Sequence, residues 1–173
     1  MAEIAEFIIR PARPDDAEQL ISHVHHMAVE ASQWLPMQPG EFQVSVEEER
    51  EILAKAAASP NSLFRVAEVD WSIVGMLNYS GGKRQATRHG ATFSISVRSA
   101  WQCRGIGTAL LTAAIRHAKE SGCVRRLDLQ VYADNERAIR LYTRLGFAAE
   151  GVLRKAVLRN GEFIDELMMA LIW

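Results

Sequence analysis

The chain has 173 residues, of which 49% are hydrophobic and 24% are charged, close to the composition of an ordinary globular protein. This length suits one domain, so residues 1–173 are expected to form a single domain whose core needs neither a disulfide nor a metal. The 20 Lys and Arg residues against 21 Asp and Glu residues leave a net charge of −1, which argues against a protein that coats nucleic acid or an anionic membrane through bulk charge.

The N-terminal segment Met1–Arg10 lacks the basic start and longer apolar stretch of a secretory signal. No apolar run approaches the roughly 18 residues that span a bilayer, and the longest is Leu167–Trp173. The two cysteines, Cys103 and Cys123, are too few for a disulfide framework or a four-ligand zinc site. We therefore expect a cytoplasmic protein with free thiols, no bound metal and no membrane partner.

The first part of the chain predicts one strand and two helices. Phe7–Arg10 is short, apolar and β-branched, which is typical of a strand. Residues 14–31 carry apolar side chains at helical spacing. A second helix is expected over 45–58, because Glu48 stands three residues after a serine and completes a capping box. Prolines and a glycine between the two helices predict a loop over 32–44.

The rest of the chain alternates between strand and helix patterns. Alternating apolar residues predict strands, and apolar residues three and four apart predict helices. Asn160-Gly161 between two apolar runs is a strong hairpin signal. The expected elements are strands at 63–69, 72–77 and 92–97, a helix at 106–121 capped by Gly122, a strand at 127–131, a helix at 135–145, and strands at 147–158 and 163–171. This order predicts a mixed α/β domain around one sheet.

A glycine-bearing segment, Val97–Thr108, runs from the end of a strand into the start of a helix. Gly105 and Gly107 let the backbone approach a ligand closely, and the helix start offers unpaired N–H groups and a positive dipole end. Together they suit a phosphate or pyrophosphate, with added charge from Arg104 and a hydroxyl from Thr108. The glycines alone also fit a simple tight turn. The segment matches neither a P-loop nor the dinucleotide fingerprint.

Two motifs resemble those of the GNAT family of N-acetyltransferases. Gln102-x-Arg104-Gly105-x-Gly107 resembles the acetyl-CoA loop of that family, and Asn135–Phe147 resembles its Asn…Ala-x-x-Leu-Tyr-x-x-x-Gly-Phe segment. Leu158–Glu166 resembles the branch that contains bacterial small-molecule and ribosomal-protein N-acetyltransferases. The implied fold is a single domain with a mixed, mostly antiparallel sheet of about seven strands, flanked by about four helices. Two parallel strands, at 92–97 and 127–131, would splay apart in a V.

The resemblance also implies how acetyl-CoA binds. The pantetheine arm would lie in the splay and bond like an added strand to the backbone of Ile95, Ser96 and Val97. Asn135, which also suits a helix cap, would contact the cofactor near the thioester. The pyrophosphate would be held at the backbone of seven consecutive residues: Gln102, Cys103, Arg104, Gly105, Ile106, Gly107 and Thr108.

Acetyl transfer to an amine passes through a tetrahedral oxyanion, which needs a fixed donor. By resemblance, this donor is a backbone N–H near Val97, and Tyr142 is the general acid that protonates the departing CoA thiolate. Position alone is equally compatible with Tyr142 as a packing residue of an amphipathic helix. A phenol has a pKa of about 10 and a thiol about 8.5, so the proton transfer is feasible without being strongly driven.

The group that removes the acceptor's proton is left open by the sequence. An alkylammonium has a pKa of about 10 and must lose a proton before attack. Many relatives carry a carboxylate early on the strand that leads to the cofactor, and residues 89–93 contain none. A water chain, His89, or a carboxylate such as Glu30 or Glu41 remains as an alternative.

Three segments are expected to shape the acceptor site: the loop 32–44, the loop 80–88 and the final hairpin. The first loop is unusually apolar and contains Trp34. This favours a small apolar or amphipathic amine, such as an amino acid, over a polyamine. Acetylation of a protein N-terminus and a noncatalytic acyl-CoA-binding module are the alternatives. The apolar final strand, which ends at Trp173, suggests a homodimer.

Overall fold

The structure is a computed structural model that describes residues 6–173. The first half of the N-terminal segment in which we expect no secretory signal, Met1–Ala5, lies outside the described residues. The described chain forms one seven-stranded sheet in the order β1-β2-β3-β4-β5-β7-β6. Its strands and longer helices are β1 (Ile8–Pro11), α1 (Ala17–Glu30), α2 (Val46–Ala58), β2 (Ser62–Val69), β3 (Ser72–Gly81), β4 (Gly90–Val97), α3 (Ile106–Glu120), β5 (Arg126–Tyr132), α4 (Glu136–Arg144), β6 (Ala148–Arg159) and β7 (Glu162–Ile172).

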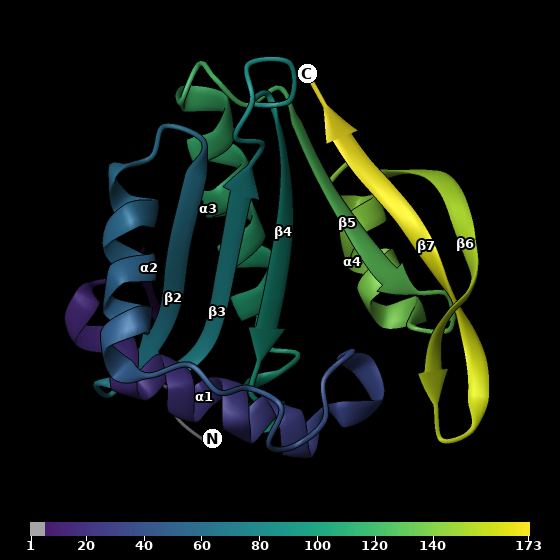
Figure 1. The fold of residues 1–173 in the computed structure, drawn as a ribbon, viewed down its shortest axis with the longest axis horizontal. Helices are drawn as coiled ribbons and strands as arrows, with labels where there is room; N and C mark the ends of the chain where they lie inside the picture. The colour runs from purple at the N-terminus through teal and green to yellow at the C-terminus, as the bar shows by residue number, and fades with distance from the viewer. Residues whose placement is uncertain (1–5) are drawn as a thin grey trace.

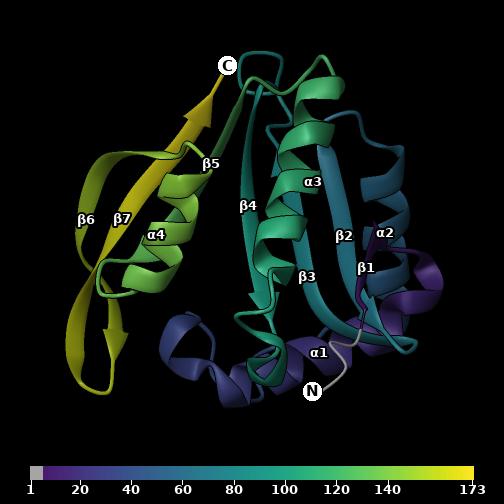
Figure 2. The same ribbon diagram turned by 180° about the vertical axis from the view of Figure 1, so that it is seen from behind.

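The sheet is mixed and mostly antiparallel, as predicted. β4 and β5 run parallel, and the other neighbouring strands pair antiparallel. Helices α1 and α2 lie on the face nearer the viewer in Figure 1, whereas α3 and α4 cover the opposite face, as Figure 2 shows. The predicted order of strands and helices is therefore confirmed for residues 6–173.

Apolar spacing explains how the helices pack on the two faces of the sheet. On α3, the side chains of Ile106, Leu110 and Ala114 are almost fully buried against the strands. Leu20 of α1 and Leu53 of α2 share a second cluster on the other face. These side chains recur every three or four residues, so one stripe of each helix faces the sheet.

The capping box, the hairpin turn and the glycine helix cap predicted from the sequence are present at the start of α2, between β6 and β7, and after α3. The hydroxyl of Ser45 accepts the N–H of Glu48, and the Glu48 carboxylate accepts the N–H of Ser45, which completes the predicted capping box. Asn160 and Gly161 both have positive φ, at 51° and 82°, as a tight hairpin between β6 and β7 requires. Gly122, after α3, also has a positive φ of 65°.

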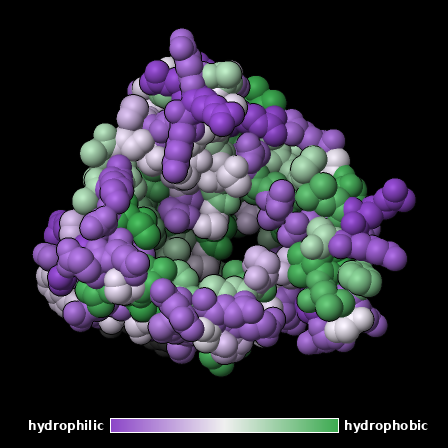
Figure 3. All heavy atoms as spheres, in the orientation of Figure 1, coloured by the Kyte–Doolittle hydropathy of each residue, from purple (hydrophilic) through white to green (hydrophobic). Residues whose placement is uncertain are grey.

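The V-shaped splay is present between β4 and β5. The two strands pair at three positions, Gly90–Thr92 with Arg126–Asp128, and then diverge (Figure 1). The edge of β4 over 93–97 that faces β5 therefore has no partner strand. Figure 3 shows a hollow in the molecular face at this place. A sheet interrupted in this way exposes backbone donors and acceptors that another extended chain can pair with.

Some boundaries differ from the sequence prediction. The loop expected over 80–88 is shortened, since β3 continues to Gly81 and β4 begins at Gly90. Backbone hydrogen bonds extend the pairing there: the N–H of Gly81 donates to Asn61 and that of Gly82 donates to Gly90. Polar side chains concealed this extension in the sequence. The loop 32–44 contains a short 3-10 turn at Ser32–Trp34.

The apolar final strand is used within the domain. β7 lies between β5 and β6, and Met169 and Leu171 pack against the main core together with Trp173. The feature that suggested a homodimer is thus explained by the core, and the homodimer stays a prediction. Over residues 6–173, no helix has the length and apolar character that crossing a membrane requires.

Candidate active site

The glycine-bearing loop forms a concave run of backbone N–H groups at the start of α3. Cys103 and Gly105 have positive φ angles of 61° and 86°, and Gly105 is the N-cap of the helix. The N–H of Ala109 donates to the Gly105 carbonyl at 2.9 Å, so the N–H groups before it lie outside the regular ladder of the helix. A backbone that alternates between left-handed and other conformations points successive N–H groups to one side. Such a backbone makes an anion-binding nest at the positive end of the helix dipole.

Side chains around this loop link it to neighbouring elements. The side chain of Gln102 donates to the Val97 carbonyl at 2.9 Å and accepts from Arg137 of α4 at 2.9 Å. The guanidinium of Arg104 lies 4.7 Å from the ring centre of Trp101. Gln102 therefore joins the end of β4 to the helix on the other side of the splay. Its own backbone N–H donates to the Ser99 carbonyl at 3.2 Å, so the N–H groups left to face a phosphate begin at Cys103.

Tyr142 lies on α4, packed against the strand that borders the splay. It is 8% exposed, and its ring makes edge contacts with Phe93 of β4 and with Phe147. Burial raises the pKa of the Tyr142 phenol to about 12. The hydroxyl therefore stays protonated over the physiological range and is able to donate a hydrogen bond.

Asn135 begins α4 and fixes the position of this helix beside β5. Its side-chain oxygen accepts the N–H of Ala138 at 3.2 Å, so the predicted cap is confirmed. Its own N–H donates to the carbonyl of Tyr132 at the end of β5. The cap holds Asn135 and Tyr142 on one short helix next to the splay.

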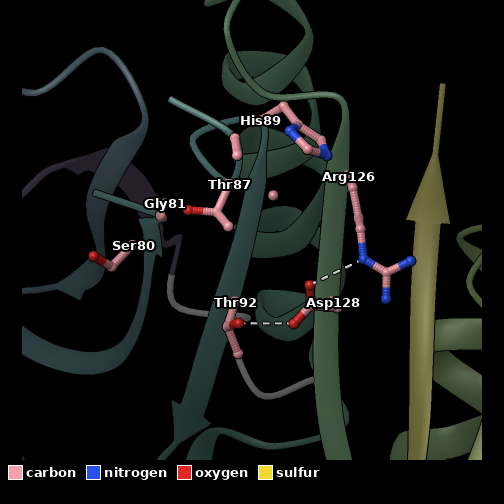
Figure 4. A pocket seen from close by; sticks show the side chains of 10 residues that line it. Ser80, Gly81, Thr87, His89, Thr92, Arg126 and Asp128 are labelled. Carbon is pink, nitrogen blue, oxygen red and sulfur yellow. Dashed lines mark hydrogen bonds and ion pairs between the residues drawn. The ribbon is translucent and has the colours of Figure 1, made fainter. Parts of the chain in front are cut away.

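A cavity of about 400 Å³ lies at the closed end of the splay, lined by residues of β3, β4, β5 and the loop between β3 and β4. Figure 4 shows Asp128 turned toward β4 and Arg126 extending toward β7. The hydroxyl of Thr92 donates to Asp128 at 2.7 Å, and Arg126 donates to the same carboxylate at 3.2 Å. Arg126 also bonds Glu150, which lowers the pKa of that carboxyl.

A second cavity of about 380 Å³ lies at the open end of the splay, between the loop after α1 and the β6–β7 hairpin. Arg159 of β6 crosses this region. Its guanidinium pairs with Asp134, donates to the carbonyl of Gln33, and lies over the rings of Trp34 and Tyr132. The apolar part of the lining comes from Leu35, Pro36, Val157 and Leu158.

The arrangement of splay, anion-binding nest and flanking cavities agrees with comparisons to known proteins. The model of the acetyltransferase (GNAT) family matches residues 26–147. The chain belongs to the GNAT family. Among solved structures, an acetyltransferase of this family from Streptococcus pneumoniae superposes with a TM-score of 0.94 at 30% identity, covering 97% of this chain and 100% of that one.

Two curated relatives of this GNAT chain come from Escherichia coli strain K12. The L-amino acid N-acetyltransferase AaaT is 39% identical over 105 residues, which are 61% of this chain and 65% of that protein. The ribosomal protein uS5-alanine N-acetyltransferase is 31% identical over 99 residues, which are 57% of this chain and 50% of that protein. The matches therefore span half to about two-thirds of these relatives.

The four residues predicted to face the acceptor lie in different places in the GNAT domain. His89 lines the closed-end cavity and Glu41 lines the open-end cavity. Trp34 lies under Arg159 beside the open-end cavity. The Glu30 carboxylate accepts the N–H of Ser99 at 2.8 Å and lies 3.3 Å from His26. The fold does not bring these four side chains together, and their contact with an acceptor stays a prediction.

Two residues that sequence reasoning missed stand out in this GNAT domain, Asp128 and Arg159. Asp128 lies in the strand Leu-Asp-Leu-Gln-Val, in which apolar and polar side chains alternate. This strand, β5, has a neighbouring strand on each side, where a continuous apolar run is more usual. An interior strand with a polar face borders an open space, so the alternation was a usable signal. Arg159 is the last residue of β6 and carries no comparable sequence signal.

Proposed function

We propose that the chain transfers the acetyl group of acetyl-CoA to the primary amine of a small molecule through a ternary complex. The observation that carries this proposal is the unpaired edge of β4 directly preceding the anion-binding nest at the start of α3. An extended arm that ends in a pyrophosphate matches this pair of features. Membership of the acetyltransferase family supports the same reading.

The cofactor side uses backbone groups. Ile95, Ser96 and Val97 offer the free edge of β4 to the pantetheine arm, and the N–H groups of Cys103–Thr108 hold the pyrophosphate. Arg104 is exposed beside this nest and adds positive charge. A site built mainly from N–H groups explains how a chain with a net charge of −1 binds a polyanion.

In the reaction, the amine nitrogen attacks the thioester carbonyl and its electron pair moves onto the oxygen. A backbone N–H near Val97 stabilises this oxyanion. The carbon–sulfur bond then breaks, and CoA leaves as a thiolate. Because the Tyr142 pKa is about 12 and a thiol has a pKa of about 8.5, complete transfer of the phenolic proton is unfavourable. Tyr142 instead stabilises the departing sulfur by donating a hydrogen bond.

The acceptor class follows from the open-end cavity. Its wall combines apolar side chains with the rings beside Arg159 and one carboxylate, Glu41. This composition suits an amphipathic amine with an apolar body, such as an amino acid, and does not suit a polyamine, which needs several carboxylates together. The similarity to an L-amino acid N-acetyltransferase supports this choice.

The test is the release of CoA thiol from acetyl-CoA in the presence of an amine panel. The panel contains apolar amino acids, polyamines and a peptide with an N-terminal alanine, because a second relative acts on the alanine of a ribosomal protein. Turnover that is highest with free amino acids supports the proposal. Turnover confined to the peptide favours protein N-terminal acetylation, and tight CoA binding without any turnover favours a noncatalytic module.

A further inference from the structure

The proposed acetyl transfer requires a group that accepts a proton from the acceptor's ammonium. We propose that Asp128, together with its hydrogen-bonded partner Thr92, binds this ammonium and that the Asp128 carboxylate takes up its proton. The inference rests on the proposed function and adds a catalytic residue to it. It also places the acceptor's ammonium at the vertex of the splay, beside the closed-end cavity, with the apolar body of the acceptor directed toward the open-end cavity.

Asp128 lies at the vertex of the splay. Thr92 and Asp128 are the last paired residues before β4 and β5 diverge, so their side chains stand at the vertex of the V. The neighbouring residues Leu127 and Leu129 are buried in the core that α3 covers, so alternation places Asp128 on the opposite face of the sheet. Its side chain is 30% exposed and lines the closed-end cavity.

Thr92 and Asp128 both retain free hydrogen-bond acceptors. Thr92 donates its hydroxyl hydrogen to Asp128, as Figure 4 shows, which leaves the lone pairs of the Thr92 oxygen free to accept. The Asp128 carboxylate also retains acceptor capacity, because an ionised carboxylate has about four lone-pair sites and two are engaged. An ammonium brings three donors and no acceptor, so it matches this pair of oxygens.

The side chains around Asp128 carry a net negative charge. Arg126 donates to both Asp128 and Glu150, so the three side chains together carry one negative charge. An ammonium is therefore attracted to the site even though an arginine stands in it. Figure 4 shows the Arg126 guanidinium on the far side of Asp128 from Thr92, away from the gap between β4 and β5.

Of the other candidates, two carboxylates are hydrogen-bonded elsewhere and one histidine is exposed to solvent. Glu30 accepts the Ser99 N–H, and Glu41 accepts the N–H of Gln38 at 2.8 Å. His89 is exposed in the loop before β4, three residues before Thr92 and farther from the opening of the splay. Asp128 is the carboxylate of the closed-end cavity lining.

The proton balance is complete with this assignment. The ammonium gives one proton to the Asp128 carboxylate, and the freed nitrogen lone pair forms the carbon–nitrogen bond. When the carbon–sulfur bond breaks, a second proton of the nitrogen ends on the CoA sulfur. The products are the amide and CoA thiol, and Asp128 then releases its proton to water.

The experiment compares Asp128→Asn with Glu150→Gln in the full chain. Each variant removes one carboxylate from Arg126, and only Asp128 faces the vertex of the splay. We expect kcat/KM of the parent protein to be nearly flat between pH 6 and 8. In Asp128→Asn it falls at least 100-fold at pH 7 and rises about tenfold per pH unit, because only free amine reacts. Glu150→Gln retains the parent profile, and acetyl-CoA affinity is unchanged in both variants.

A second acceptor separates proton removal from structural damage. An acyl hydrazide is unprotonated at pH 7, so Asp128→Asn is expected to acetylate it within about threefold of the parent rate. If Asp128→Asn fails to fold, Asp128→Ser replaces it and is expected to show the same pH slope, because it also removes the carboxylate.

Three results overturn the inference. These are equal effects of the Asp128 and Glu150 substitutions, an unchanged pH profile in the tested Asp128 variant, or an equal loss of activity with the hydrazide. If the parent protein turns over no amine at all, the proposed function fails together with this inference. If the parent is active and Asp128→Asn keeps its pH profile, only this inference fails.

Discussion

Lowering the pH from 7 to 5 is expected to destabilise the fold through His23. This residue of α1 is 0% exposed, and its Nε2 lies 2.9 Å from the hydroxyl of Ser96 on β4. Among the described residues, its Nδ1 is buried without a hydrogen-bond partner. Burial lowers the pKa of His23 to about 4, and the charges of Arg98 and His26 act in the same direction against the opposing charge of Glu30.

The sign and size of this change in the free energy of unfolding follow from proton linkage. In the unfolded chain a histidine has a pKa of about 6.5, so between pH 6.5 and 4 the unfolded state binds a proton that the folded state does not. The contribution of His23 is therefore fully present above pH 6.5 and is lost as the pH falls toward 4. Between pH 7 and pH 5 the free energy of unfolding should drop by about 2 kcal/mol from this residue.

The assay is urea unfolding of the parent protein and of His23→Gln at pH 7, 6 and 5. Glutamine keeps a hydrogen-bonding group for Ser96 and does not titrate, and the other four histidines are common to both chains. The parent should lose about 2 kcal/mol more than the variant over this interval. Equal losses in the two chains, or an NMR titration of His23 near pH 6.5, would refute the reasoning.

Five further substitutions test the site and the core. Tyr142→Phe should slow acetyl transfer on the order of 10- to 100-fold, with unchanged acetyl-CoA affinity by calorimetry, since it removes one hydrogen bond to a developing charge; an unchanged rate contradicts this role. Gly105→Ala should raise KM for acetyl-CoA severalfold because alanine is strained at a φ of 86°, whereas Gly122→Ala, at a φ of 65° beyond the other end of α3, should alter stability alone. Leu110→Ala should lower the unfolding free energy by about 2–5 kcal/mol, measured in urea, because its side chain is 0% exposed. Arg159→Ala should raise KM for the amine and leave KM for acetyl-CoA unchanged in steady-state assays, and equal changes in both would contradict its assignment to the acceptor side.

Much of the candidate site was accessible from the sequence because its signals are local. The two glycines and Arg104 stand within a few residues of the helix start that they serve. The cap at Asn135 and the position of Tyr142 belong to one short helix. In each case the geometry depends on backbone conformation over a few neighbouring residues, which local residue types control.

The acceptor side was less accessible because its contacts join distant parts of the chain. Thr92 and Asp128 are 36 residues apart, and Arg159 reaches Gln33 across 126 residues. Their approach depends on the register between β4 and β5 and on the placement of the β6–β7 hairpin beside the loop after α1. No local pattern in the sequence encodes either relation.

The sequence by itself determined the order of strands and helices and predicted an anion site at the start of α3, because apolar periodicity and glycine placement act within each element. The mixed sheet followed from the family resemblance. The tertiary structure alone decided where the parallel pairing stops and which side chains then stand at the vertex. Three paired residues on each strand leave Thr92 and Asp128 bonded at the edge of an open gap. The packing of whole helices against both faces sets that register, so the contact between Thr92 and Asp128 at the gap is seen only in the folded chain.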